Sequence, residues 1–77
     1  MTTPTEFDLT GLKCPMPIVR LTQMIKGVAP GHQVVVTADD PAFRPDLQAW
    51  CRSTGHELIA IEQVERRLVA TLRKKKA

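Results

Sequence analysis

The chain is 77 residues long, with 43% hydrophobic and 25% charged residues and a formal net charge of +3 at pH 7. This length excludes a catalytic domain beside a separate substrate domain, and the composition excludes a disordered chain. No apolar run reaches the roughly 20 residues that a bilayer-spanning helix needs. Residues 1–7 lack the basic region and the apolar stretch of a secretory signal, so we expect a cytoplasmic protein without a membrane partner.

Positive charge is concentrated in the second half of the chain. Residues 1–40 hold three basic and four acidic side chains, whereas residues 41–77 hold eight basic and four acidic ones. Four of the basic residues form the run 73–76. Within a single domain we expect an ordered core over 6–73 and a frayed, solvated basic tail over 74–77. The alternative is that this tail contacts an acidic protein or RNA.

Hydrophobic periodicity predicts the first three elements of the chain. Residues 7–10 alternate between apolar and polar, which is typical of a half-buried strand, and Gly11 ends them. Apolar residues three or four positions apart predict a helix over 18–28, which Pro30-Gly31 terminates. The β-branched run at 34–38 indicates a strand that is largely covered.

The second half of the chain predicts one helix and two strands. The helix begins near Pro45, because proline suits the first helical turn, and Gly55 is a natural stop. Residues 56–64 and 67–73 predict strands joined by a hairpin turn at 65–66. The order β-α-β-α-β-β predicts an α/β chain of the α+β two-layer kind. Both helices then pack on one face of a mixed four-stranded sheet, and the other face is exposed.

Cys14 is the candidate catalytic residue because of the residues that follow it. Pro15 disfavours a helical Cys14 and suits the first turn of a helix that begins after it. We therefore expect Cys14 to cap the first helix, with its sulfur at the positive end of the helix dipole. Such a position lowers the pKa of a cysteine thiol, and Lys13 beside it adds a positive charge. The predicted site is a surface thiolate that acts as a nucleophile at neutral pH.

Pro17 restricts the hydrogen bonds that the sulfur can receive. It has no N–H, which leaves the N–H of Met16 as the remaining donor toward Cys14. We hypothesise that Pro15 and Pro17 stiffen the loop and leave the sulfur with few hydrogen bonds. A small buried cysteine at a helix start fits the same local pattern, so the residues alone leave both interpretations open.

Three segments of the chain resemble the TusA/SirA-like sulfur-carrier family. The first, 11–17, reads Gly-Leu-Lys-Cys-Pro-Met-Pro and contains a Cys-Pro-x-Pro motif. The second, 40–42, reads Asp-Pro-Ala, and the third, 50–58, reads Trp-Cys-Arg-Ser-Thr-Gly-His-Glu-Leu. The resemblance extends over residues 7–74 in order. It departs at 65–67, where Glu-Arg-Arg replaces the glycine-bearing turn that the family leads us to expect.

The resemblance implies a two-layer fold and a sulfurtransferase of the carrier type, which requires neither a metal nor an organic cofactor. It implies that Cys14 takes the outer sulfur of a persulfide from a donor protein, a cysteine desulfurase or a rhodanese-like protein. Cys14 then passes the sulfur to the thiol of an acceptor protein. We expect Lys13, Pro15, Met16 and Pro17 to shape this site. The family serves tRNA thiolation, cofactor biosynthesis and sulfur oxidation, and the resemblance does not choose among them.

Two rival functions remain open at this point. A regulatory or protein-interaction module would use Cys14 as a redox or structural residue. An RNA-binding module would use the basic second half of the chain, but no aromatic side chain lies in the run 73–76. We therefore do not expect direct nucleic-acid binding, and we expect a monomer.

The second cysteine has a mainly structural interpretation. Cys51 and Trp50 lie on the apolar face of the predicted second helix, so we expect both in the core rather than a resolving thiol or a stacking platform. A disulfide between the two cysteines is not expected in a reducing cytosol. A zinc site would require Cys14, His32, Cys51 and His56, whose spacing lacks the usual paired ligands.

Several other residues near the motif have a structural as well as a functional interpretation. Exposed Met16, Arg20 and Lys26 either form a docking surface for partner proteins or belong to an ordinary solvated helix face. Asp39 and Asp40 precede a proline and are interpreted as turn formers, not as a pair of carboxylates for acid–base chemistry.

Overall fold

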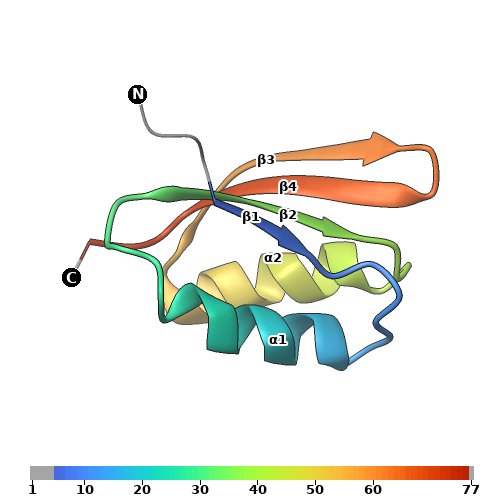
Figure 1. The fold of residues 1–77 in the computed structure, drawn as a ribbon, viewed down its shortest axis with the longest axis horizontal. Helices are drawn as coiled ribbons and strands as arrows, with labels where there is room; N and C mark the ends of the chain where they lie inside the picture. Colours follow the sequence, from blue (N-terminus) through green and yellow to red (C-terminus); the bar gives the residue numbers. More distant parts are fainter. Residues whose placement is uncertain (1–4, 77) are drawn as a thin grey trace.

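The computed structural model describes residues 5–76, and the segment 1–4 and residue 77 lie outside the described residues. The elements are β1 (Thr5–Asp8), α1 (Met16–Ile25), β2 (Gln33–Ala38), α2 (Phe43–Thr54), β3 (Glu57–Val64) and β4 (Arg67–Arg73). Figure 1 shows both helices on the same side of the sheet. The predicted α+β class and element order are therefore confirmed. No helix in the described part of the chain has the length and apolar character needed to cross a bilayer.

The sheet is mixed, with the strand order β1-β2-β4-β3. β1 pairs in parallel with β2, and Phe7 lies opposite Val36. β4 pairs antiparallel with both β2 and β3. Because β1 and β2 run in the same direction, their carboxyl ends meet at one edge of the sheet. The loop that carries Cys14 therefore lies beside the loop that leads into α2 (Figure 1).

The core fills the layer between the sheet and the helices. Residues of the central strands β2 and β4 alternate between this layer and the outer face, as the predicted period of two in β4 requires, whereas β3 at the edge has no fully buried residue. The largest fully buried side chains are Phe43, Leu9, Leu21, Leu47, Leu72, Val34, Val36 and Pro17. No buried side chain within residues 5–76 is polar or charged. Each large apolar side chain contributes about 1.5–3 kcal/mol on burial, so this core supplies the main folding energy.

Both helices begin before the first residue of their predicted ranges, although α1 begins one residue later than a Cys14 cap would place it. α1 begins at Met16, although the apolar periodicity starts at Ile18. α2 begins at Phe43, two positions before Pro45, because Phe43 is itself a core residue that the helix carries inward. The predicted stop at Gly55 is confirmed, since this residue takes the left-handed conformation with a φ of 86°.

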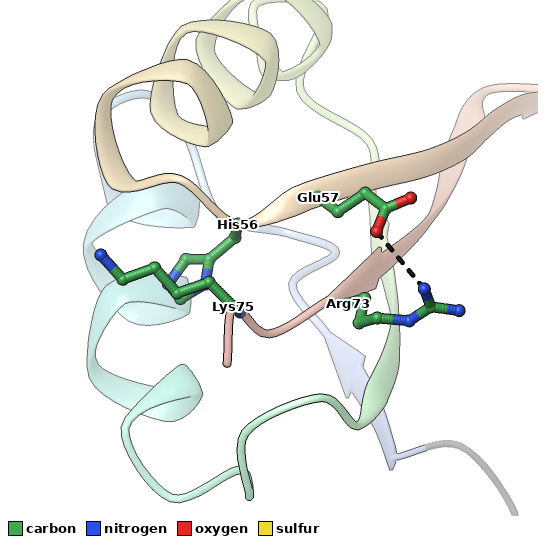
Figure 2. A network of polar contacts seen from close by, with 4 residues as sticks. All are labelled: His56, Glu57, Arg73 and Lys75. Carbon is green, nitrogen blue, oxygen red and sulfur yellow. Dashed lines mark hydrogen bonds and ion pairs between the residues drawn. The ribbon is translucent and has the colours of Figure 1, made fainter. Parts of the chain in front are cut away.

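Two of the C-terminal lysines make hydrogen bonds to the rest of the fold. The N–H of Lys74 donates to the carbonyl of His32 at 2.9 Å, and its ammonium donates to the carbonyl of Val28 at 2.7 Å. The N–H of Lys75 donates to Nδ1 of His56 at 3.1 Å (Figure 2). Lys74 and Lys75 therefore contact the loops that follow both helices and the residue before β2, while the side chains of Lys75 and Lys76 are exposed.

An exposed ion pair lies next to these contacts. Nη1 of Arg73 lies 3.4 Å from Oε1 of Glu57, which joins the end of β4 to the start of β3 (Figure 2). Exposed pairs of this kind contribute about 0–1 kcal/mol, so the pair supports the strand register only weakly.

Candidate functional site

Cys14 lies in the loop between β1 and α1, with an exposed side chain and a free thiol. The helix N-cap is Pro15, not Cys14 as the sequence pattern suggests. Its carbonyl accepts the N–H of Val19 at 3.1 Å, which begins the intrahelical hydrogen bonds. Cys14 thus lies one residue before the cap, and the interpretation of this residue as a small buried hydrophobe is wrong.

The sulfur of Cys14 receives no hydrogen bond from the start of α1. The N–H of Met16, which the sequence analysis assigned to the sulfur, donates instead to the carbonyl of Lys13 at 2.8 Å. Pro17 has no N–H and is buried in the core. The local donors that would stabilise a thiolate are therefore absent or already used.

Two carboxylates hold the loop that carries Cys14. Oδ2 of Asp40 accepts the N–H of Cys14 at 3.0 Å, and Oδ1 of Asp39 accepts the N–H of Gly11 at 3.0 Å. Both aspartates follow β2, whose parallel pairing with β1 places the two loops side by side. Asp39 and Asp40 thus do more than form a turn, because they fix the backbone on both sides of Leu12 and Lys13.

A third carboxylate contacts the sulfur itself. Sγ of Cys14 donates a hydrogen bond to Oδ2 of Asp46 in the first turn of α2, at 3.3 Å. This hydrogen bond raises the pKa of the Cys14 thiol above its usual 9.0, and desolvation and the negative charges of Asp46 and Asp40 act in the same direction. The predicted lowering of this pKa is therefore wrong. The surroundings of Cys14 therefore favour its protonated thiol over the thiolate.

A shallow groove of about 400 Å³ opens beside the sulfur, between α1 and α2. Its walls are mainly apolar and are formed by Pro15 and Ile18 on one side and by Ala49 and Trp50 on the other. Cys14 and Asp46 lie along the same groove. An exposed thiol beside an apolar recess can be reached by a second protein that places an apolar side chain in the recess.

Residues 5–74 match the family model described as Sulfurtransferase TusA. The chain belongs to the TusA sulfurtransferase family. A sulfur carrier protein TusA from Pseudomonas paraeruginosa is 36% identical over 77 residues, which cover 97% of this chain and 98% of that protein. Membership of this family assigns the chain a general role in carrying and transferring sulfur.

Two further comparisons concern length and fold. A longer relative from Aquifex aeolicus is 30% identical over 67 residues, which cover 87% of this chain but only 34% of that protein. A solved SirA-like protein from Desulfitobacterium hafniense has a TM-score of 0.76 at 22% identity, covering 94% of this chain and 99% of that one. This structural likeness supports the two-layer fold of the TusA-family chain.

Of the three residues predicted to form a docking surface, Met16 and Arg20 lie near Cys14 and Lys26 does not. Met16 and Arg20 are exposed in the first half of α1, close to the motif. Lys26 is the C-cap at the opposite end of this ten-residue helix, about 15 Å away at 1.5 Å per residue. Val19, which the sequence analysis did not select, is exposed on α1 and adds apolar surface near Met16.

The second cysteine of this TusA-family chain is free and buried, as its apolar helix face predicts. Burial raises the pKa of the Cys51 thiol, which makes it a poor nucleophile. Trp50 is also in the core, although one edge of it forms the groove beside Cys14. Among the residues that the structure describes, no three His, Cys, Asp or Glu side chains come together as metal ligands.

Asp46 is the main site residue that sequence reasoning missed. It lies 32 positions after Cys14, in the first turn of α2, and no motif in the sequence connects it with the cysteine. Asp40 lies in a segment that carries the family resemblance, and this was the only sequence signal for its contact with the Cys14 loop. The parallel pairing of β1 with β2, which brings the two loops together, is known only from the structure.

Proposed function

We propose that this TusA-family chain accepts the outer sulfur of a donor persulfide on Cys14 and passes it to the thiol of an acceptor protein. The observation that carries the proposal is a single exposed free thiol, held in a fixed loop beside an apolar groove. The other thiol is buried, so Cys14 is by far the more accessible of the two to a partner protein. The family assignment supplies the sulfur chemistry.

The proposed loading step conserves atoms and electrons. The Cys14 sulfur attacks the outer sulfur of a donor persulfide, R–S–SH, and forms a new S–S bond. The S–S bond of the donor breaks, and its inner sulfur leaves with the electron pair as a thiolate. The proton lost by Cys14 is balanced by the proton that this thiolate takes up, so the products are R–SH and a Cys14 persulfide. No external oxidant or reductant is needed.

The unloading step repeats the same displacement with the roles exchanged. The thiolate of the acceptor protein attacks the outer sulfur held by Cys14, and Cys14 leaves as a thiolate that is then protonated. We propose a cysteine desulfurase or a rhodanese-like protein as the donor. Pro15, Pro17, Lys13 and Met16 shape the loop, and Arg20 adds a charge to the docking face.

The relay is tested with a cysteine desulfurase and cysteine labelled with radioactive sulfur. We expect the label to bind the wild-type chain in a form that a reductant removes, and to move to an acceptor protein with a free thiol after the donor is withdrawn. The Cys14→Ser variant should acquire no label, and the Cys51→Ser variant should behave as wild type. A folded wild-type chain that stays unlabelled while the desulfurase itself carries the label would refute the proposal.

A further inference from the structure

The carboxylate of Asp46 has an unusual position for a protein that uses a cysteine nucleophile. It accepts a hydrogen bond from the thiol of Cys14 at 3.3 Å, whereas cysteine nucleophiles are usually activated by cationic neighbours or by helix N–H groups. A thiol keeps its proton for this hydrogen bond, and a thiolate beside the same carboxylate is repelled. The contact therefore opposes the reactive form of Cys14 in the free chain.

The acidic groups around Cys14 favour the same protonated state. Asp40, from the loop before α2, holds the N–H of Cys14 at 3.0 Å, and Asp46 comes from α2 itself. Lys13 is the adjacent cation in the loop, and α1 carries the exposed Arg20 one turn beyond the start of the helix, but neither lines the groove, whose wall on this side is formed by Pro15 and Ile18. Within residues 5–76 the only ion pair joins Arg73 and Glu57, so neither aspartate has a cationic partner.

We propose that Asp46 is a positioning residue that keeps Cys14 as an unreactive thiol in the free carrier, and that the donor protein releases it by pairing a basic side chain with Asp46. The inference rests on the proposed sulfur-carrier function and adds the regulation of its site. The surface that the donor would contact combines an apolar recess, formed by Ile18 and Trp50, with an unpaired carboxylate at its edge. The matching partner segment carries an apolar side chain next to a lysine or an arginine.

Pairing of Asp46 with a cation of the donor would favour loss of the proton from the sulfur of Cys14. Once Asp46 turns toward a partner's ammonium or guanidinium, its hydrogen bond to the thiol is lost and its charge is neutralised. The pKa of Cys14 is then no longer raised by its largest cause, and the thiolate forms within the complex. The carrier would thus become nucleophilic only where a donor sulfur is within reach, and it would resist oxidation and alkylation when alone.

The first half of the test uses a reagent that needs no partner. Alkylation of Cys14 by iodoacetamide is measured across pH by peptide mass spectrometry in wild type, Asp46→Asn and Asp46→Glu, with Glu62→Gln as a charge-matched control on the exposed strand β3. We expect the alkylation profile of Asp46→Asn to shift to lower pH, with a several-fold faster reaction at pH 7. Asp46→Glu should restore much of the wild-type profile, and Glu62→Gln should not differ from wild type. An unchanged profile in a folded Asp46→Asn protein would overturn the proposal.

The second half of the test asks whether the donor protein releases the Cys14 thiol from Asp46, or whether loss of Asp46 simply makes the thiol more reactive toward every donor. Sulfur acceptance at pH 7 is compared for a small donor, glutathione persulfide, and for a cysteine desulfurase. We expect Asp46→Asn to accept sulfur faster than wild type from the small donor but no faster from the enzyme, because the enzyme already releases the wild-type thiol. Equal acceleration with both donors would overturn the role of the partner. A wild-type chain that accepts sulfur from neither donor would refute the proposed function, while the alkylation profile would still decide whether Asp46 restrains Cys14.

Discussion

The indole N–H of Trp50 in α2 donates a hydrogen bond to the hydroxyl of Thr22 in α1 across 3.0 Å. The same hydroxyl donates to the carbonyl of Ile18 at 2.7 Å, one helical turn earlier. Ile18 and Trp50 form opposite walls of the groove beside Cys14. Thr22 therefore links the two helices at the position that sets the width of this groove.

Removal of the Thr22 hydroxyl should loosen this link. Thr22→Val leaves the mostly buried indole N–H without its partner, and we expect the free energy of unfolding to fall by about 1 kcal/mol. Thr22→Ser keeps the hydroxyl and should lose less. Urea unfolding followed by the fluorescence of Trp50, the single tryptophan, measures both variants. A Thr22→Val protein as stable as wild type would show that the hydrogen bond contributes nothing to helix packing.

Asp40 should affect the thiol less than Asp46 does. Its charge is the smallest of the causes that raise the pKa of Cys14, because it bonds the backbone N–H rather than the sulfur. We expect Asp40→Asn to move the alkylation profile of Cys14 to lower pH, but by less than Asp46→Asn. Asp40→Ala should also release the loop and speed its cleavage by proteases. If Asp40→Asn shifted the alkylation profile as far as Asp46→Asn does, the explanation that only Asp46 bonds the sulfur would be contradicted.

Glu65 has an unfavourable backbone conformation in the hairpin turn between β3 and β4. Among the described residues it is the only non-glycine with a positive φ, at 57°. Glycine adopts this region without steric penalty, so we expect Glu65→Gly to raise the free energy of unfolding by about 0.5–1 kcal/mol. Arg66→Gly, at a position without a positive φ, should lower it. Chemical denaturation of both variants checks this, and a loss of stability in Glu65→Gly would disprove the explanation.

His56 should make the stability depend on pH. Its Nδ1 accepts the N–H of Lys75, which only the ring without a proton on that nitrogen can do, and burial together with the charges of Lys75 and Lys74 lowers its pKa below 6.5. The unfolded state then binds the proton first, so stability is complete above about pH 6.5 and decreases as the pH falls through the lowered pKa. Urea unfolding between pH 7.5 and 5 measures this decrease.

The matched variant for this pH dependence is His56→Asn, whose amide oxygen accepts a hydrogen bond without titrating in this range. It should remove most of the pH dependence. The pKa of Asp8 is lowered from 3.8, so its contribution lies at lower pH and does not interfere. The same slope in His56→Asn and in wild type would assign the pH dependence to another group.

Local patterns in the sequence predicted most of the fold. The period of two in β4, the stop at Gly55 and the buried position of Cys51 all depend on neighbours a few residues away, and all are confirmed. The hydrogen bond from the N–H of Lys74 to the carbonyl of His32 could not be predicted, because charge composition carries no information on backbone pairing.

The candidate site was predictable in position but not in electrostatics. The Cys-Pro-x-Pro motif places Cys14 in a loop before α1, which the structure has. The contact with Asp46 depends on how α1 and α2 pack, and no local pattern contains a relationship between residues 32 positions apart. The predicted direction of the shift in the pKa of Cys14 was therefore wrong, because the helix start and Lys13 are visible in the local sequence and the contact with Asp46 is not.

The most direct test of the sulfur-carrier account is the mass of the intact protein after incubation with a cysteine desulfurase and free cysteine, for wild type, Cys14→Ser and Cys51→Ser. The account predicts that wild type and Cys51→Ser each gain one sulfur atom that a reductant removes, and that folded Cys14→Ser gains none. A gain of sulfur by Cys14→Ser equal to that of wild type would contradict the assignment of Cys14 as the carrier.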